Sequence, residues 1–345
     1  MQAGVLKDVN DVSYMTVADP RLETGDLLIR VRAATVCGTD IRILRGKKTT
    51  GIRYPSILGH EFAGEVADNG GHSQFKIGQA VCVCPQFACG HCERCIQGAE
   101  NLCRNVTAMG YEIDGAFAEF VRIPARGVAT GNVFCVPEGL TFEQAALAEP
   151  LACVMNGQER VGVHLGDVVA VLGAGPIGIL HIKLARRAGA RRIVVSEPNP
   201  LRREAALKAG ADVAVDPANE DLFGCMLAAS GGLGADVVIV AIGVPSLAND
   251  AIRLARPRGR ISLFAGFSKG AHAELDVNAI HYNELVVTGS SGLGRLQFER
   301  ALNMIASGHL EVDSLLTHRF GLRDIQKALD TAEHGSAIKV AIVGE

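Results

Sequence analysis

The sequence has no long apolar stretch, no strong excess of charge of one sign and no secretion signal at its start. No run of apolar residues approaches the roughly 20 that a membrane-spanning helix needs. The formal net charge of −3 argues against nucleic acid or an acidic membrane surface as the main partner. The opening segment MQAGVLKDVNDVSYM lacks the basic-then-apolar pattern of a secretory signal. These absences predict a cytoplasmic protein with no membrane or nucleic-acid partner.

Internal repeats and low-complexity linkers are also absent, and a length of 345 residues suggests two domains. A hydrophobic share of 48% is enough for substantial cores. Up to about residue 150 the chain is rich in short strand-like runs that Gly, Pro and Asn turns interrupt. These runs lie at 27–33, 65–67, 80–83 and 116–121.

From about residue 154 the pattern changes to apolar strands that alternate with helical segments. Six strands are expected at 168–172, 192–196, 213–215, 237–240, 260–264 and 285–288. This alternation predicts an α/β fold with a doubly wound parallel sheet, the Rossmann domain, over residues 154–289. A helix at 296–307 then leads to a strand at 339–343, which we expect to rejoin the first domain. The second, β-rich domain is therefore predicted to contain residues 1–153 and 290–345.

Four of the ten cysteines fall within one short segment with the spacing C-x2-C-x2-C-x7-C: Cys89, Cys92, Cys95 and Cys103. A structural zinc ion needs four thiolates that converge on one point, and short loops between ligands allow that convergence. Two disulfides or four unpartnered thiols are the alternatives, and the absence of a secretion signal disfavours the disulfides. The segment therefore predicts a structural zinc lobe. Its acidic and basic residues balance, which gives little support to a nucleic-acid-binding zinc module.

A glycine-rich motif follows the first strand of the predicted Rossmann domain. Its residues are Gly173, Ala174, Gly175, Pro176, Ile177 and Gly178, and a helix begins within it. This context is typical of a loop that brings backbone N–H groups against a dinucleotide pyrophosphate, although packing glycines in a turn are an alternative. Glu197 ends the next strand, where a carboxylate can bind both ribose hydroxyls and repel a 2′-phosphate, so we predict NAD rather than NADP. Arg202 either stacks on the adenine or is a solvated helix charge.

A second set of metal-ligand residue types lies outside the cysteine lobe. Cys37, the pair His60-Glu61, and Glu149, which precedes a proline, offer the sulfur, nitrogen and oxygen ligands of an open catalytic zinc site. Each residue alone is more often a core or loop residue. Together with the glycine-rich motif they predict a zinc enzyme that uses a dinucleotide.

These motifs, in this order, resemble those of the zinc-dependent medium-chain alcohol dehydrogenase family. GHEFAGEV at 59–66, the four-cysteine lobe, EPLAC at 149–153 and GAGPIG carry the resemblance, which covers essentially the whole chain. The chain is most similar to the sorbitol (polyol) and threonine dehydrogenase branch. The resemblance implies a GroES-like catalytic domain beside the Rossmann domain. It implies catalytic-zinc ligands at Cys37, His60 and Glu61, with Glu149 as a fourth ligand, direct or through water. It also implies a homotetramer or dimer.

The same resemblance implies that Thr39 is the hydroxyl residue that passes the substrate proton outward. Many family members have a histidine three residues later, which ends the proton relay, whereas this chain has Arg42. Arginine stays protonated and cannot act as a base near neutral pH. The relay then ends in water or the cofactor ribose, or Arg42 binds an anionic group. A surface salt bridge is the remaining alternative for Arg42.

The sequence therefore predicts an oxidoreductase that transfers a hydride from a secondary alcohol, a polyol or sugar alcohol, to NAD with the help of zinc. L-threonine 3-dehydrogenase and a sugar-alcohol-phosphate dehydrogenase share every motif and stay open as alternatives. A dinucleotide-binding sensor without chemistry is disfavoured, because all the residues of the open zinc site are retained.

Overall fold

The structure is a computed structural model that describes residues 1–344. The chain divides into two compact units, one made of residues 1–152 together with the residues from Leu293 onward, and one made of Cys153–Gly292. The boundary falls inside helix α5 (Ala148–Val161). None of the described helices is long and apolar enough to cross a membrane.

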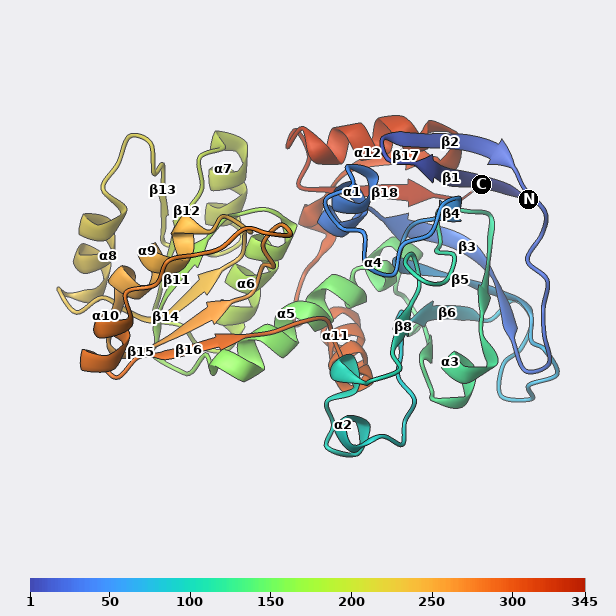
Figure 1. The fold of residues 1–345 in the computed structure, drawn as a ribbon, viewed down its shortest axis with the longest axis horizontal. Helices are drawn as coiled ribbons and strands as arrows, with labels where there is room; N and C mark the ends of the chain where they lie inside the picture. The colour runs from blue at the N-terminus through green and yellow to red at the C-terminus, as the bar shows by residue number, and fades with distance from the viewer. Residues whose placement is uncertain (345) are drawn as a thin grey trace. The chain divides into compact units, whose positions relative to one another are not determined.

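The first unit is built on a mixed sheet around the long strand β3 (Leu27–Thr35) (Figure 1). The strand order is β10-β6-β5-β3-β18-β17, and β9 also pairs with β3. The bounds of the other strands are β10 (Val133–Cys135), β6 (Ala80–Val83), β5 (Glu61–Asp68), β18 (Lys339–Val343), β17 (Leu316–Gly321) and β9 (Phe120–Ile123). Strand β18 pairs antiparallel with β3, so residues 339–343 are part of this sheet.

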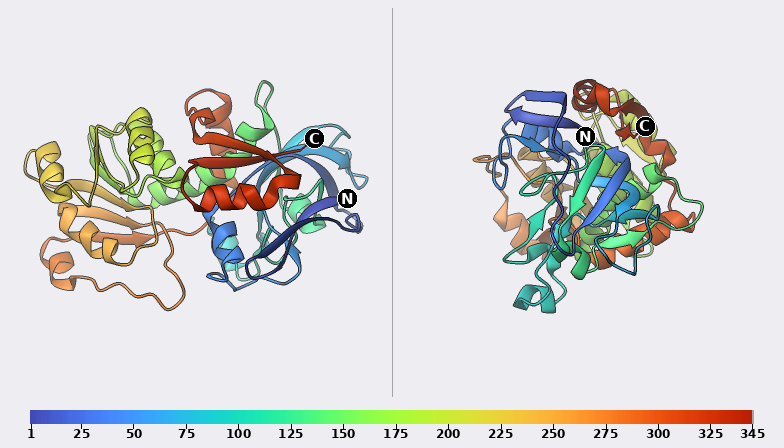
Figure 2. Two further views of the ribbon diagram at one scale, coloured as in Figure 1. Left: turned by 90° about the horizontal axis from the view of Figure 1, so that it is seen from above. Right: turned by 90° about the vertical axis from the view of Figure 1, so that its right-hand side faces the viewer.

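Smaller strands and helices surround this sheet. The strands β1 (Gln2–Asp8), β2 (Asp11–Thr16) and β4 (Ser56–Ile57) form a three-stranded sheet, and β7 (Gln86–Phe87) pairs with β8 (Thr107–Ala108). Helix α12 (Ile325–Glu333) lies beside β17, β18 and the β1–β2 hairpin (Figure 2). The remaining helices are α1 (Gly38–Leu44), α2 (Glu93–Ile96), α3 (Ala125–Ala129), α4 (Phe142–Ala146) and α11 (Arg295–Ala306).

One predicted strand of this unit is displaced. Residues 116–121 were expected to form a strand, but β9 begins only at Phe120. The preceding residues Ala116, Phe117 and Ala118 are buried in an irregular segment, where Phe117 N–H bonds to the Leu58 carbonyl and Ala118 bridges to Ala3. The apolar run therefore reflects burial against two neighbouring segments rather than a continuous ladder.

The second unit is a six-stranded parallel sheet with the strand order β13-β12-β11-β14-β15-β16. This order has its reversal between β11 and β14, as in the Rossmann fold, and confirms the predicted doubly wound sheet. The strand bounds are β13 (Val213–Val215), β12 (Arg192–Ser196), β11 (Val168–Leu172), β14 (Ala235–Val240), β15 (Ala255–Leu263) and β16 (Val286–Gly289). All five residues of β11 are buried, because helices cover the sheet on both faces (Figure 1). These helices are α6 (Pro176–Arg187), α7 (Pro200–Lys208), α8 (Leu222–Ser230), α9 (Ser246–Leu254) and α10 (Val277–Tyr282).

Candidate functional site

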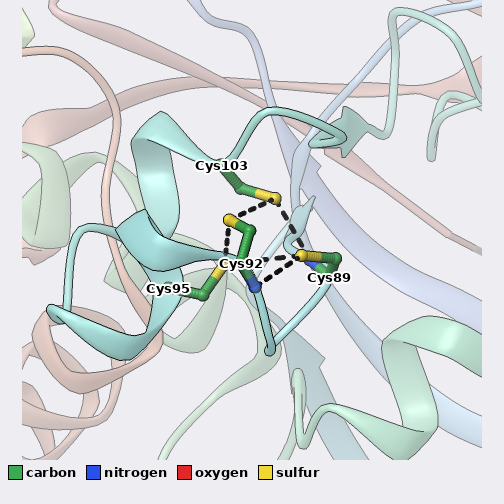
Figure 3. A group of neighbouring side chains, drawn as sticks. All are labelled: Cys89, Cys92, Cys95 and Cys103. Carbon is green, nitrogen blue, oxygen red and sulfur yellow. Dashed lines mark hydrogen bonds between the residues drawn. The ribbon is translucent and has the colours of Figure 1, made fainter.

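The four cysteines of the predicted zinc lobe converge on one point (Figure 3). Their sulfur atoms all lie within 4.8 Å of one another, and three of the separations are 3.5, 3.9 and 3.9 Å. A tetrahedron with Zn–S bonds of about 2.3 Å has edges of about 3.8 Å, so the cysteines fit a zinc ion. The separations are far too long for disulfides, whose sulfur atoms are about 2.0 Å apart.

Backbone N–H groups surround the sulfur atoms of this lobe and favour thiolates. The N–H of Cys89 donates to Cys103 Sγ at 3.2 Å, and the N–H of Cys92 donates to Cys89 Sγ at 3.3 Å. Backbone hydrogen bonds from Cys95 and Arg104 lower the pKa of Cys92 to about 6. Metal binding requires deprotonated sulfur, which these hydrogen bonds favour at Cys89 and Cys92, whereas burial raises the pKa of Cys95 to about 12.

An ion pair attaches the zinc lobe to α11. Glu100, which lies between Cys95 and Cys103, accepts hydrogen bonds from the Arg295 side chain at 3.0 and 3.1 Å. These bonds are the main cause of the lowered pKa of Glu100, and its burial opposes them. Arg295 also donates to the Thr130 carbonyl. The lobe is thereby fixed to the β-rich unit at a point away from the sulfur atoms.

The second metal-ligand group consists of Cys37, His60 and Glu61, which the sequence predicted as catalytic-zinc ligands. One ligand atom from each lies within 4.8 Å of the others, and both His60 and Glu61 are buried. Strand β5 begins at Glu61, and α1 begins immediately after Cys37. Sulfur, nitrogen and oxygen donors so close together fit a zinc ion. Glu149, the predicted fourth ligand, is buried in the first turn of α5 but is not part of this group of close ligand atoms.

Asp40 is hydrogen-bonded to the backbone of one of these ligands and lies close to the ring of another, and the sequence analysis gave it no role. It is fully buried on α1. Its Oδ2 accepts the N–H of Cys37 at 2.8 Å, and its Oδ1 lies 3.4 Å from Nδ1 of His60. A carboxylate beside Nδ1 favours the tautomer that leaves Nε2 free as the metal ligand. A carboxylate three residues after the cysteine, on the same helical turn, was the available sequence signal.

Glu61 has two further buried partners that the sequence analysis did not identify. Lys339, on β18, donates to Glu61 Oε1 at 2.8 Å, and the Thr35 hydroxyl donates to Oε2. Burial lowers the pKa of Lys339, but the charges of Glu61 and Cys37 outweigh it and the net shift is upward. The lysine therefore stays charged and neutralises part of the negative charge that the ligands bring together.

Two residues lie at the edge of this metal-ligand group. Thr39, the predicted proton-relay residue, is partly buried in the first turn of α1, two residues after Cys37. The ring of Tyr111 lies 5.5 Å from the ring of His60, and burial raises the pKa of its hydroxyl. Tyr111 was not predicted, because it is 51 residues from His60 in the sequence and carries no motif.

The glycine-rich motif of the second unit has the geometry of a dinucleotide-binding loop. Gly173 has a φ of +98°, which favours glycine. A Cβ at Gly178 would lie 2.0 Å from the carbonyl oxygen of Gly173, so only glycine allows this contact between helix and strand. Pro176 begins α6, with Ile177 in its first turn, and the free N–H groups of the helix start can bind phosphate.

Glu197 contacts this loop directly. The carboxylate is buried, and it accepts the N–H of Ala174 at 2.7 Å and the N–H of Asn199 at 2.9 Å. Arg203 donates to the carbonyl of Glu197 at 2.9 Å and pairs with Asp216. Nε of the predicted adenine neighbour Arg202 is buried and has no hydrogen-bond partner among the described residues. The loop, the Glu197 carboxylate and Arg203 therefore form one connected group.

Comparison with known proteins gives two family matches. Residues 23–133 match the alcohol dehydrogenase GroES-like domain, and residues 176–307 match the zinc-binding dehydrogenase domain. L-threonine 3-dehydrogenase of Pyrococcus furiosus is 33% identical over 331 residues, which are 94% of this chain and 92% of that protein. Sorbitol dehydrogenase of Bacillus subtilis is 30% identical over 96% of this chain and 93% of its own length. A zinc-binding dehydrogenase from Sinorhizobium meliloti, solved with NADP, is 32% identical with a TM-score of 0.90 and covers 99% of this chain and 98% of its own.

Proposed function

The chain belongs to the zinc-dependent medium-chain alcohol dehydrogenase family, and we propose that it oxidises a secondary alcohol group of a polyol or sugar alcohol with NAD. It is a zinc-binding oxidoreductase that acts on alcohols and uses a nicotinamide cofactor. The observation that carries the proposal is the convergence of Cys37, His60 and Glu61 on one point in a chain that also has an intact dinucleotide loop. L-threonine 3-dehydrogenase is the second candidate, because the P. furiosus relative of that name is 33% identical, compared with 30% for the sorbitol dehydrogenase.

The proposed roles of the side chains follow from their geometry. Cys37, His60 and Glu61 hold the catalytic zinc, and Glu149 is an exchangeable fourth ligand. Zinc in such a site acts as a Lewis acid that lowers the pKa of a hydroxyl group. Asp40 keeps His60 in the ligating tautomer.

Proton transfer is assigned to Thr39. Its hydroxyl accepts the substrate proton through a hydrogen bond and passes it to water or to the cofactor ribose, since Arg42 cannot serve as a base. The nicotinamide accepts the hydride, and the chemistry of that step belongs to the cofactor. Removal of one proton and one hydride from the secondary alcohol leaves a ketone.

Cofactor choice is assigned to Glu197. The buried carboxylate lies against the glycine-rich loop, where the adenosine ribose of a dinucleotide binds in this fold. Its negative charge disfavours the 2′-phosphate of NADP. The S. meliloti relative was solved with NADP, so the preference must be measured for this chain.

The four-cysteine lobe is assigned a structural zinc. We further propose a cytoplasmic homo-oligomer, a tetramer or a dimer, which light scattering after size-exclusion chromatography can test.

The experiment that tests the function is a substrate panel with the zinc-loaded enzyme. Polyols such as sorbitol, vicinal diols, L-threonine and sugar-alcohol phosphates are offered with NAD and separately with NADP, and formation of the reduced cofactor is followed by absorbance. Oxidation of a polyol with NAD supports the first candidate, and oxidation of L-threonine alone supports the second. No oxidation of any alcohol by an enzyme with full zinc content would refute both.

A further inference from the structure

Two basic residues, Arg42 on α1 and Lys48 in the segment after it, have no role in the mechanism above. After α1 the backbone folds back, because the N–H groups of Lys47 and Lys48 both donate to the carbonyl of Arg42, at 2.8 and 3.1 Å. The fold-back brings Lys48 close to the helix that begins after Cys37 and that carries Thr39 and Arg42.

Lys48 contacts an aromatic ring that in turn lies beside the ligand His60. Its Nζ lies 5.0 Å from the ring centroid of Tyr111, and that centroid lies 5.5 Å from the ring of His60. The Nζ atom is therefore at most 10.5 Å from the His60 ring. Lys48 is partly buried, and among residues 1–344 it has no carboxylate within 4.0 Å of its ammonium group. In that part of the chain, the direct partner of the ammonium group is the face of Tyr111.

The electrostatic environment of Lys48 disfavours its ammonium charge. Burial is the main cause of the lowered pKa of Lys48, and the like charge of Arg42 adds to it. Glu112 is the acidic group that opposes this shift, and its carboxylate already accepts the N–H of Ala108 at 3.0 Å. An anion bound here would remove the repulsion between Arg42 and Lys48.

We propose that Lys48, supported by Arg42, binds an anionic group of the substrate, so that the preferred substrate is a hydroxy compound with a carboxylate or a phosphate. The proposal rests on the proposed function, because it places the reacting hydroxyl at the centre formed by Cys37, His60 and Glu61. The upper bound of 10.5 Å between Lys48 Nζ and the His60 ring is compatible with a short substrate that has its hydroxyl at one end and its anionic group at the other. Tyr111 holds the ammonium group in place through its ring face.

The test compares matched pairs of substrates that differ only in the anionic group. Suitable pairs are gluconate with sorbitol, sorbitol 6-phosphate with sorbitol, and L-threonine with threoninol. The wild-type holoenzyme should have a higher kcat/KM for the anionic member of each pair. Comparison of the pairs with a carboxylate and the pair with a phosphate shows which anion the site accepts. Lys48→Met keeps the stem and removes the charge. It should lower kcat/KM for the anionic member by about 10- to 100-fold, the range of a lost charged hydrogen bond, mainly through KM. The neutral member should be unaffected.

Three further measurements make the result decisive. Lys47→Met removes an exposed neighbouring charge and should match the wild type, and Lys48→Arg should restore most of the loss. The anionic compounds should raise the melting temperature of the complex between the holoenzyme and NADH for the wild type but not for Lys48→Met. This binding measurement does not depend on turnover, so it separates failure of this proposal from failure of the proposed function.

Three results would overturn the proposal. The first is a wild-type preference for the neutral compounds. The second is an equal loss for both members of each pair in Lys48→Met. The third is a weaker affinity of Lys48→Met for NADH itself, which would assign the lysine to the cofactor pyrophosphate.

Discussion

His181 provides a test of the packing of the dinucleotide-binding unit, because it is a fully buried imidazole that must stay neutral. It lies on α6, and its ring meets the edge of Phe264 at a centroid distance of 4.6 Å. The amide Nε2 of Gln158 lies 3.3 Å from Nδ1 of His181 and donates to the His181 carbonyl at 2.8 Å. Because an amide N–H group faces Nδ1, this nitrogen must accept a hydrogen bond, and it can do so only when the imidazole ring is neutral. Burial lowers the pKa of His181 from 6.5 to about 3.

The lowered pKa makes the stability of this unit depend on pH. Between pH 6.5 and pH 3 the unfolded chain binds a proton at this position and the folded chain does not, so acid favours unfolding. The contribution of His181 is complete above about pH 6.5 and is lost as the pH falls toward 3. As the pH falls, this residue lowers the free energy of unfolding by about 1.4 kcal/mol per pH unit, which amounts to about 2 kcal/mol between pH 6.5 and pH 5.

Urea unfolding of the zinc-loaded protein at several pH values, followed by circular dichroism and by hydrogen exchange of the α6 amides, measures this effect. In His181→Leu the slope should be smaller than in the wild type by about 1.4 kcal/mol per pH unit. His272→Leu removes an exposed histidine from the same unit and should keep the wild-type slope. Parallel pH dependences for the wild type and His181→Leu would refute the reasoning, because other groups would then account for all of the acid sensitivity.

Three further predictions concern the proposed site residues. Cys95→Ser should reduce zinc from two ions per chain to one and lower the melting temperature, whereas an unchanged metal content would contradict the four-cysteine site. Glu197→Gln keeps the shape of the side chain but removes its charge. It should raise the affinity for NADPH relative to NADH by about tenfold or more, as measured by fluorescence titration. A wild-type enzyme that already prefers NADPH would contradict the assignment. Thr39→Val should lower kcat by roughly 10² to 10⁴ with little change in zinc content, and near-normal turnover when hydride transfer limits the rate would remove Thr39 from the mechanism.

Local sequence patterns predicted the parts of the structure that depend on neighbouring residues. The alternation of buried strands and helices was enough for the six strands of the parallel sheet, including β11 at its observed bounds. The four cysteines were recognisable because short loops bring nearby ligands together. In both cases the number of residues between the groups along the chain determines how far apart the groups lie in the folded structure.

Contacts between distant segments could not be predicted in this way. Lys339 reaches Glu61 only because β18 pairs with β3, which in turn pairs with β5, and no motif marks that lysine. Tyr111 and Lys48 likewise meet through folding of two loops. Strand 116–121 was misplaced because an apolar run indicates burial but not hydrogen-bond pairing. Whether Glu149 binds the metal also depends on a side-chain position that no spacing rule fixes.

The pairing of β18 with β3 has a consequence for biosynthesis. The dinucleotide-binding unit is continuous in sequence, so it can fold on the ribosome as soon as residue 292 has emerged. Strands β3 and β5, made much earlier, must wait for β18, which is synthesised last among the described strands. Until then Glu61 lacks the buried cation that balances its charge. Zinc loading of the catalytic centre is therefore expected to follow the synthesis of β18, whereas the four-cysteine lobe, whose ligands span only residues 89–103, can bind its metal much earlier.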